Sequence, residues 1–237
     1  MKILVIAAHP DDEVLGMGGT IKKLTKSGNK VKIVILATGI AARRSTTFQN
    51  NTKYGINEKD KKIIESQIKE IRSQAKKASR ILGVNDIEFL DFPDNEMDTV
   101  SSLKITKTIE SIINKFKPNK IFTHSPFDVN VDHRLIYQAT LTATRPNSQR
   151  NVEEVYSFEV PSSTEWFFPM SFQPNVFVDI SKELKVKLKA MSMYKKEVKK
   201  FPHPRSLKLL EHVSKRWGSV SGFSAAEAFY LVRQLKK

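Results

Sequence analysis

The sequence predicts an α/β fold in which a mostly parallel β-sheet is flanked by helices within a single domain. Apolar strand-like runs alternate with amphipathic helical segments over residues 1–145, a pattern typical of right-handed strand–helix–strand units. The chain has 237 residues, 40% of them hydrophobic and 27% charged, which is enough to bury one core. No linker or repeat divides it. We expect residues 146–237 to add strands and helices to the same domain.

The first strands are continuous apolar runs rather than alternating ones. Residues 2–8 and 31–37 are rich in Ile, Val, Leu and Ala, as expected for parallel strands buried on both faces. A helix is expected between them, over residues 12–26. Residues 38–57 are rich in Gly, Arg, Ser, Thr and Asn and predict an irregular loop, and a loop of that length is often functional.

The remaining elements follow from apolar spacing. Steps of three and four predict helices at 64–82, 105–116 and 131–144, separated by short strands at 87–90 and 120–123. Beyond Pro146, the pattern predicts strands at 152–159 and 176–180, followed by three helical stretches at 182–200, 205–216 and 224–236.

The composition excludes several classes of protein. The chain contains no cysteine, so any metal site must be built from His, Asp and Glu. No apolar run approaches the ~20 residues that a membrane-spanning helix needs. The first strand stops at His9-Pro10, which makes it too short for a secretory signal, and a cytoplasmic location is the default expectation.

The net charge of +15 invites a nucleic-acid-binding interpretation. The lysines, however, are spread along expected helices, where solvated faces explain them, and few aromatic residues lie among them. We therefore expect no nucleic-acid partner. A positive field would favour an anionic substrate such as a nucleotide sugar.

The strongest chemical signal is His9-Pro10-Asp11-Asp12-Glu13, directly after the first strand. In an open parallel sheet, ligands bind beyond the carboxyl ends of the strands. Gathering four ionisable side chains there is costly unless a cation or a substrate offsets their repulsion. An imidazole and a carboxylate suit a divalent metal, zinc above all. Asp11 and Asp12 are adjacent, so one can bind the metal while the other faces a water molecule.

A catalytic zinc usually takes three protein ligands, so a further histidine is needed from another strand end. The stretch from Asp128 to His133 follows the strand that ends at Thr123, and His133 is the expected ligand. Alone, His9 would more often be a turn residue and His133 a capping or core residue. Two His-Asp clusters at successive strand ends favour the metal site.

These motifs resemble the LmbE-like, or PIG-L, family of zinc-dependent N-deacetylases, and the resemblance extends over nearly the whole chain. Further matching positions are Gly16, Gly18-Gly19, Thr38-Gly39 with Arg43, Phe92-Pro93-Asp94-Asn95, and Gly218, Gly222 and Ala226-Glu227-Ala228-Phe229. The resemblance implies a Rossmann-like fold and one Zn²⁺ per chain, although another divalent metal is compatible. It also implies His9, Asp12 and His133 as ligands and Asp11 as general base.

One position departs from the family members that act on thiol precursors. They have a second histidine three residues before the last ligand, where this chain has Asn130. An asparagine can donate a hydrogen bond to an oxyanion but cannot supply a proton. The chain is closer to the branch with a later His-Pro-Arg-Ser, here His203 to Ser206. We hypothesise that His203 is a catalytic acid or a substrate contact, although a helix-start role fits it as well.

Arg43, Asp94 and Arg205 are the expected substrate contacts. A guanidinium suits sugar hydroxyls or a phosphate, although Arg44 could take the place of Arg43, and either could be a solvated loop residue. Asp94 is expected to hold a sugar hydroxyl or to orient a ligating histidine, and a turn former would look the same. His124, at the end of a strand, is expected to contact a metal-binding side chain. His212, in the middle of a helix, is expected to be structural.

The resulting hypothesis is a hydrolase that removes the acetyl group from an N-acetylated amino sugar or a conjugate of one. The expected partner is this small molecule, and a homo-oligomer is compatible with the sequence. Three alternatives stay open at this point: a noncatalytic nucleotide-sugar or carbohydrate-binding module, a basic nucleic-acid-associated protein, and a structural metal protein.

Overall fold

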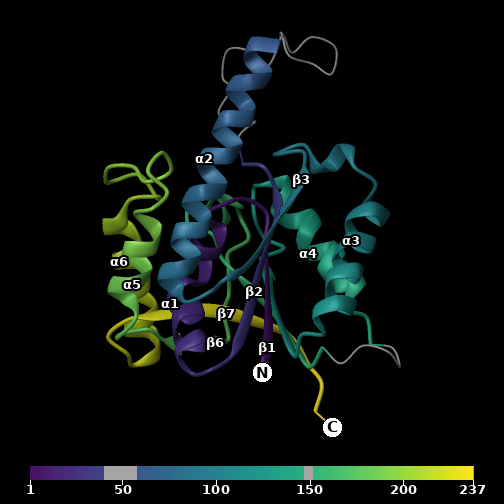
Figure 1. Ribbon diagram of the computed structural model, residues 1–237. Coiled ribbons are helices and arrows are strands. Elements are labelled where there is room, and N and C mark those ends of the chain that lie inside the picture. Colours follow the sequence, from purple (N-terminus) through teal and green to yellow (C-terminus); the bar gives the residue numbers. More distant parts are fainter. Residues whose placement is uncertain (40–57, 147–151, 237) are drawn as a thin grey trace.

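The computed structural model describes residues 1–39, 58–146 and 152–236 and has one seven-stranded sheet between two layers of helices (Figure 1). The strand order is β3-β2-β1-β4-β5-β7-β6. The first five strands in this order are parallel, and β7 is antiparallel to both β5 and β6. The strands are β1 (Lys2–Ala7), β2 (Lys30–Ala37), β3 (Asp86–Phe92), β4 (Lys120–His124), β5 (Glu154–Phe158), β6 (Val176–Asp179) and β7 (Ala226–Gln234).

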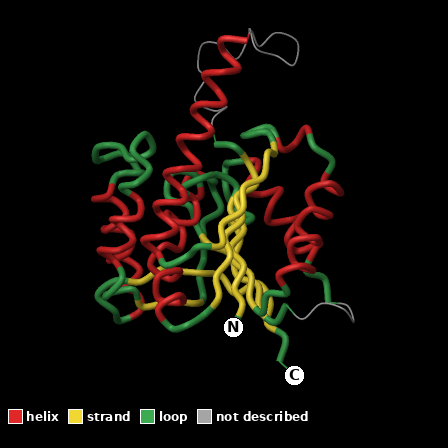
Figure 2. Tube along the Cα trace, in the orientation of Figure 1, coloured by secondary structure: helices red, strands yellow, loops and turns green. Residues whose placement is uncertain are grey.

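The helices lie on both faces of this sheet (Figures 1 and 2). One layer comprises α1 (Asp12–Lys26), α2 (Glu58–Leu82) and α5 (Leu184–Met191), with α6 (Leu207–Ser221) against α5 and β7. The other layer comprises α3 (Ser102–Phe116) and α4 (Val131–Ala143). The predicted α/β fold with a mostly parallel, helix-flanked sheet is confirmed. Among the described residues, no helix is both long and apolar enough to cross a bilayer.

The central strand β1 explains why the N-terminal sequence is apolar throughout. Ile3, Val5 and Ala7 pack into the core on the side of α1, α2 and α5, whereas Leu4 and Ile6 pack on the side of α3 and α4. The chain leaves β1 toward β2 on one side, and β4 lies on the other side. The strand order therefore reverses between β1 and β4, and in open α/β sheets ligands bind beyond the carboxyl ends of the strands at such a point.

The prediction of a helix over residues 224–236 was wrong, because most of this segment forms the strand β7. The run Ala225 to Ala228 has a high helix propensity, which suggested a helix. In the fold the segment pairs with β5 on one edge and β6 on the other, and it buries Ala226, Ala228 and Phe229. Pairing on both edges overrides the local preference.

The helix expected over residues 182–200 is also shorter than predicted, since α5 ends at Met191. The chain then forms turns that bury Tyr194 and Glu197 on the side of the N-terminal motif. Tyr194 is fully buried, and its hydroxyl donates a hydrogen bond to Glu13. This long-range contact competes with continuation of the helix.

Candidate metal centre

Residues 9–13 and 124–133 lie at the carboxyl ends of β1 and β4. The chain turns sharply at Asp11, whose φ of 116° lies in the left-handed region, and α1 starts at Asp12. On the other side, Asn130 caps α4 by accepting a hydrogen bond from the Asp132 amide at 2.9 Å, which places His133 in the first turn of that helix.

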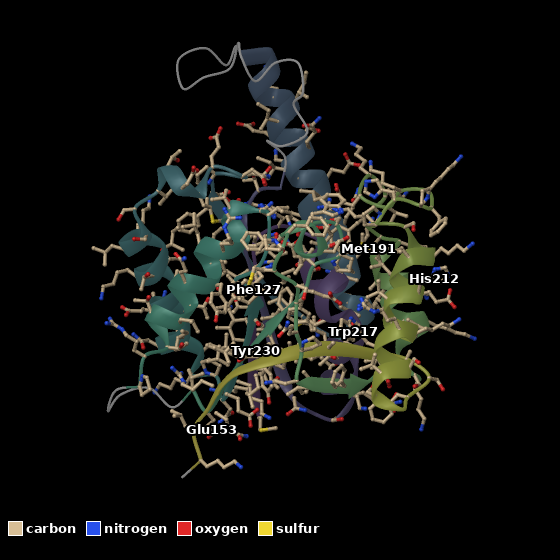
Figure 3. The ribbon with its side chains drawn as sticks, turned by 180° about the vertical axis from the view of Figure 1, so that it is seen from behind. Phe127, Glu153, Met191, His212, Trp217 and Tyr230 are labelled. Atoms are coloured by element: carbon tan, nitrogen blue, oxygen red, sulfur yellow. The ribbon has the colours of Figure 1, made fainter. Side chains whose placement is uncertain are left out.

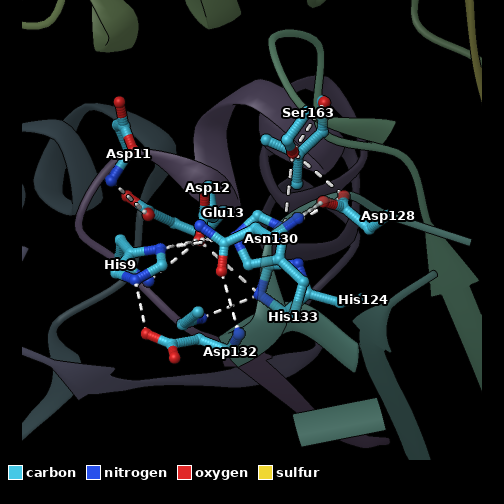
Figure 4. A network of polar contacts seen from close by, with 12 residues as sticks. His9, Asp11, Asp12, Glu13, His124, Asp128, Asn130, Asp132, His133 and Ser163 are labelled. Carbon is cyan, nitrogen blue, oxygen red and sulfur yellow. Dashed lines mark hydrogen bonds and ion pairs between the residues drawn. The ribbon is translucent and has the colours of Figure 1, made fainter. Parts of the chain in front are cut away.

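Three side chains from these segments converge on one point (Figure 4). His9 Nδ1 lies 3.3 Å from Asp12 Oδ2, His133 Nε2 lies 3.2 Å from the same oxygen, and the two imidazole nitrogens are 3.3 Å apart. All three residues are buried. Ligand atoms ~2.0–2.1 Å from a tetrahedral zinc are separated from one another by about 3.3–3.4 Å, so this triangle has the size that a zinc ion requires.

The other nitrogen of each imidazole faces a carboxylate. His9 Nε2 lies 3.0 Å from both Asp94 Oδ1 and Asp132 Oδ2, and His133 Nδ1 lies 3.0 Å from Asp128 Oδ2. Donation of the outer N–H to a carboxylate fixes the ring orientation and leaves the inner nitrogen as a ligand. The structure thus brings the three expected ligands together and surrounds them with acceptors.

The charges in the cluster favour a bound cation. Although burial raises the pKa of Asp12, the neighbouring His133 and His9 hold that pKa well below its usual value. Burial lowers the pKa of His133, but the charges of Asp12 and Asp128 outweigh it and raise that pKa to about 9. Asp12 Oδ1 is buried and has no hydrogen-bond partner among the described residues. The other oxygen of the same carboxylate, Oδ2, lies 3.2–3.3 Å from the two imidazoles. A buried carboxylate with one unsatisfied oxygen beside two imidazoles suits a metal ion.

His124 supports the cluster rather than joining it. Its Nε2 accepts a hydrogen bond from the Ala8 amide at 2.8 Å, and its ring stacks on His133 with 3.9 Å between ring centroids. Burial and the neighbouring His133 hold the pKa of His124 well below its usual value. A neutral His124 therefore packs behind a ligand, as expected from its place at the end of β4.

Asp11 lies beside the cluster, and its side chain extends away from it (Figure 4). Its amide donates a hydrogen bond to Glu13 Oε2 at 3.1 Å, which holds the left-handed turn. Its Oδ2 lies 3.4 Å from a guanidinium nitrogen of Arg205. Burial raises the pKa of Asp11 to about 7, although Arg205 lowers it. A carboxyl group with that pKa can both accept and return a proton near neutral pH.

The predicted residues of the C-terminal part have different positions. Arg205 bridges Asp11 and Glu197, lying 2.9 Å from the Glu197 carboxylate, and its Nε donates to Ser162 Oγ at 2.9 Å. His203 is exposed, and its Nδ1 accepts a hydrogen bond from the Arg205 amide at 3.0 Å. Over the described part of the chain, no hydrogen bond or ion pair joins His203 to the metal cluster.

Asn130 and Asp94 both lie at the centre, and Arg43 falls outside the described residues. Asn130 donates from Nδ2 to Asn95 Oδ1 at 2.8 Å in addition to capping α4. An amide nitrogen has two hydrogens, so one remains for another acceptor. Asp94 is buried against His9, the second of the two roles expected for it.

The sequence interpretation gave no role to several residues of the site. Asp128 lies 3.0 Å from His133 and Asp132 lies 3.0 Å from His9, and Asp132 also accepts hydrogen bonds from the backbone amides of Asn95 and Met97. Both aspartates lie within five residues of His133 in the sequence, and this proximity could have indicated that they contact the metal cluster. Tyr194 and Glu197 lie in a segment expected to be helical, and no local pattern marked them.

A cavity of about 430 Å³ lies elsewhere, over β5 and β7 (Figure 3). None of its lining residues is charged, and none is a candidate metal ligand. The lining includes Ser125, Phe127, Tyr137, Ser157, Phe172 and Tyr230. The candidate metal ligands lie beyond the carboxyl ends of β1 and β4 instead, so this cavity is separate from the candidate metal centre.

Comparison with known proteins gives one family match. The protein-family model described as "PIG-L: GlcNAc-PI de-N-acetylase" matches residues 4–144. The diacetylchitobiose deacetylase of Thermococcus kodakarensis is 29% identical over 242 residues, covering 98% of this chain and 83% of that protein. An uncharacterized deacetylase of Escherichia coli is 28% identical over 199 residues, covering 81% of this chain and 90% of its own length.

Solved structures share the fold. The N,N'-diacetylchitobiose deacetylase of Pyrococcus horikoshii has a TM-score of 0.73 at 22% identity, covering 98% of this chain and 83% of that one. The 4-carboxy-2-hydroxymuconate hydratase GalB of a Pseudomonas has a TM-score of 0.72 at 19% identity, covering 100% and 98%. Since deacetylases and a hydratase share this fold, the fold alone does not specify the reaction.

Proposed function

Because the chain belongs to the PIG-L family of GlcNAc-PI de-N-acetylases, we propose that it is a zinc-dependent hydrolase that removes the N-acetyl group from an amino sugar or an amino-sugar conjugate. The observation that carries the proposal is the buried triangle of His9 Nδ1, Asp12 Oδ2 and His133 Nε2, with sides of 3.2–3.3 Å. The deacetylase relatives support an acetamide as the substrate group.

These three atoms would hold one zinc ion per chain, and another divalent metal would find the same ligands. When bound, zinc acidifies a coordinated water and polarises a carbonyl oxygen. A set of three protein ligands that includes a carboxylate favours this open, catalytic type of site over a structural one.

Asp11 is the proposed general base and proton carrier. It would accept a proton from the water that attacks the acetyl carbon and return it to the amide nitrogen as the carbon–nitrogen bond breaks. The products are acetate and the free amine. Burial supports this role because it raises the pKa of Asp11 to about 7, where the group can exchange a proton at neutral pH. The exposed His203 is the alternative acid.

Other residues would bind the substrate. The second amide hydrogen of Asn130 is the proposed donor to the oxyanion that forms at the acetyl carbon. Arg205 borders the cluster and is, together with Arg43, the proposed contact for sugar hydroxyls. Asp94, buried against His9, is the proposed carboxylate that orients this histidine. The cytoplasmic location, the single domain over residues 1–237 and a homo-oligomer remain predictions.

The test is acetate release from N-acetylglucosamine, N,N'-diacetylchitobiose and nucleotide-linked N-acetylglucosamine, with zinc-loaded and chelator-treated protein. We expect release that chelation abolishes and zinc restores. Asp11→Asn should lower kcat by about 10²–10⁴-fold while keeping its zinc, because only the proton carrier is lost. Sugar binding without acetate release, despite stoichiometric zinc, would instead support a noncatalytic carbohydrate-binding module.

A further inference from the structure

The first helix is interrupted close to the metal ligands. Met17 has φ −149° and ψ 25°, so α1 consists of a short first piece that carries Asp12 and a longer second piece. In a continuous α-helix, the Gly19 amide would donate to the Leu15 carbonyl. A break at Met17 separates the two ends of that bond, and buried groups at both ends need partners.

Two buried side chains from the C-terminal part of the chain supply these partners. Glu227 of β7 accepts hydrogen bonds from the amides of Gly19 at 2.9 Å and Thr20 at 2.6 Å. Lys187 of α5 donates to the Leu15 carbonyl at 2.9 Å and lies 2.6 Å from Glu227 Oε1. The ion pair therefore occupies the place of the helical bond between Leu15 and Gly19.

The chemistry of this position requires a carboxylate. Three donors, two amides and one ammonium, converge on the two oxygens of Glu227. A glutamine would place an NH₂ group against at least one of these donors. Because Lys187 and Glu227 are each only 3% exposed, loss of one partner leaves the other charge buried and uncompensated.

The glycines of α1 let the pair approach. A Cβ atom on Gly18 would lie 3.3 Å from Lys187 Cγ, and a Cβ on Gly19 would lie 2.8 Å from the Ile180 side chain. A side chain at Gly19 would push α1 away from the segment that follows β6, and one at Gly18 would crowd the Lys187 side chain. The glycines and the ion pair thus act together.

We propose that Lys187 and Glu227 are positioning residues for the metal centre: the pair holds α1 in its broken form and so aims the first piece, with Asp12, at His9 and His133. Asp12 lies only three residues before Leu15, whose carbonyl Lys187 holds. A helix that closed its own Leu15–Gly19 bond would turn this first piece to another direction. The inference relies on the proposed function only in taking Asp12 as a metal ligand.

The test compares Glu227→Gln with Ile109→Ala, which removes a buried side chain of α3 on the opposite face of the sheet. Both should lower the free energy of unfolding, the first through an unpaired lysine and the second through a cavity. Zinc alone is titrated into each metal-free protein against a chelator. Amide hydrogen exchange of residues 9–20 is followed by mass spectrometry.

We expect Glu227→Gln to weaken zinc binding by about tenfold and to speed exchange over residues 9–20, whereas Ile109→Ala changes zinc affinity by less than about twofold. Lys187→Met should show the same pattern more weakly, since Glu227 then keeps its two amide donors. If Glu227→Gln fails to fold, Lys187→Met takes its place in both measurements.

Equal zinc affinity and equal exchange over residues 9–20 in the α3 control and the pair variants would overturn the proposal and leave the pair a purely structural role. Neither measurement uses a sugar, so a failure to release acetate from any substrate counts against the proposed function alone. If the wild-type protein bound no zinc, the proposed metal centre would fail. The exchange data would still decide whether the pair holds the first turn.

Discussion

The three proposed metal ligands, His9, Asp12 and His133, come from segments that follow β1 and β4, in the parallel part of the sheet. The groups that contact the turn carrying Asp11 and Asp12, and the helix α1 after it, come from α5, from β7 and from the chain between α5 and α6. We call this second region the antiparallel end of the molecule. Tyr194 binds Glu13, Arg205 lies beside Asp11, and Glu227 binds the amides of α1. In the proposed function the first region supplies the metal ligands, and the second mainly positions the turn that carries them, with Arg205 as its contribution to substrate binding.

The difference between the regions is one of sequence distance. Asp12 lies three residues from His9, whereas Glu227 lies 208 residues from the Gly19 amide that it binds. A local motif can place its own ligands, but a broken helix with a left-handed residue at its start needs support from elsewhere. If this division holds, damage to the parallel part should abolish the site, and damage to the antiparallel end should only loosen it.

The largest effect is expected from Asp12→Ala. It removes the oxygen that lies 3.2–3.3 Å from both imidazole nitrogens, so only two ligands would remain. Zinc should then be absent from the purified protein, and kcat/KM for acetate release should fall by at least about 10³-fold. Metal analysis and activity assays measure both quantities. Asp98→Ala, at an exposed acid, is the control. Stoichiometric zinc in Asp12→Ala would contradict the ligand assignment.

The contribution of the parallel part could be predicted because its signals are local. The apolar run of β1 leads directly into His9 and Asp12, and β4 leads to His133. Parallel strands bring their carboxyl ends to one edge of the sheet, so periodicity alone placed these two segments together. Resemblance to the PIG-L family then implied which of these side chains would bind a metal.

The antiparallel end could not be predicted in the same way. Its residues from Ala225 to Ala228 prefer a helix, and only pairing with β5 and β6 makes them a strand. Glu227 stood out through the family resemblance, but nothing in the sequence indicated that its carboxylate reaches α1. Tyr194 was expected on a helix. Its hydrogen bond to Glu13 depends on the tertiary fold, so the local sequence could not predict it.

An intermediate effect is expected from Asp128→Asn. This variant tests whether the parallel part also supplies a carboxylate that orients one of its own proposed ligands, His133. Asp128 Oδ2 accepts hydrogen bonds from Ser163 and Thr164 and lies 3.0 Å from His133 Nδ1. Asparagine keeps the shape but removes the charge that orients the ring. Zinc affinity should fall by about 10–100-fold, measured by chelator competition. An unchanged affinity would show that the helix alone orients His133.

The smallest effect is expected from Tyr194→Phe, which removes one hydroxyl at the antiparallel end. The fully buried Glu13 carboxylate loses one of its donors and keeps the Asp11 amide, so the free energy of unfolding should fall by about 1–3 kcal/mol in denaturant titrations. Tyr156→Phe is the matched control, because the Tyr156 hydroxyl also binds a carboxylate, that of Glu154, in a half-buried setting. Its cost should be about 1 kcal/mol or less.

Activity separates the two tyrosine variants more sharply than stability does. Glu13 also accepts the amide hydrogen of Asp11, so a Glu13 side chain freed from Tyr194 would let the left-handed turn relax and move the proposed base. Tyr194→Phe should therefore lower kcat by about 3–10-fold with KM and zinc content unchanged, whereas Tyr156→Phe should leave kcat as it is. A decrease in kcat shared by both variants would mean that the antiparallel end stabilises the fold without aiming the turn.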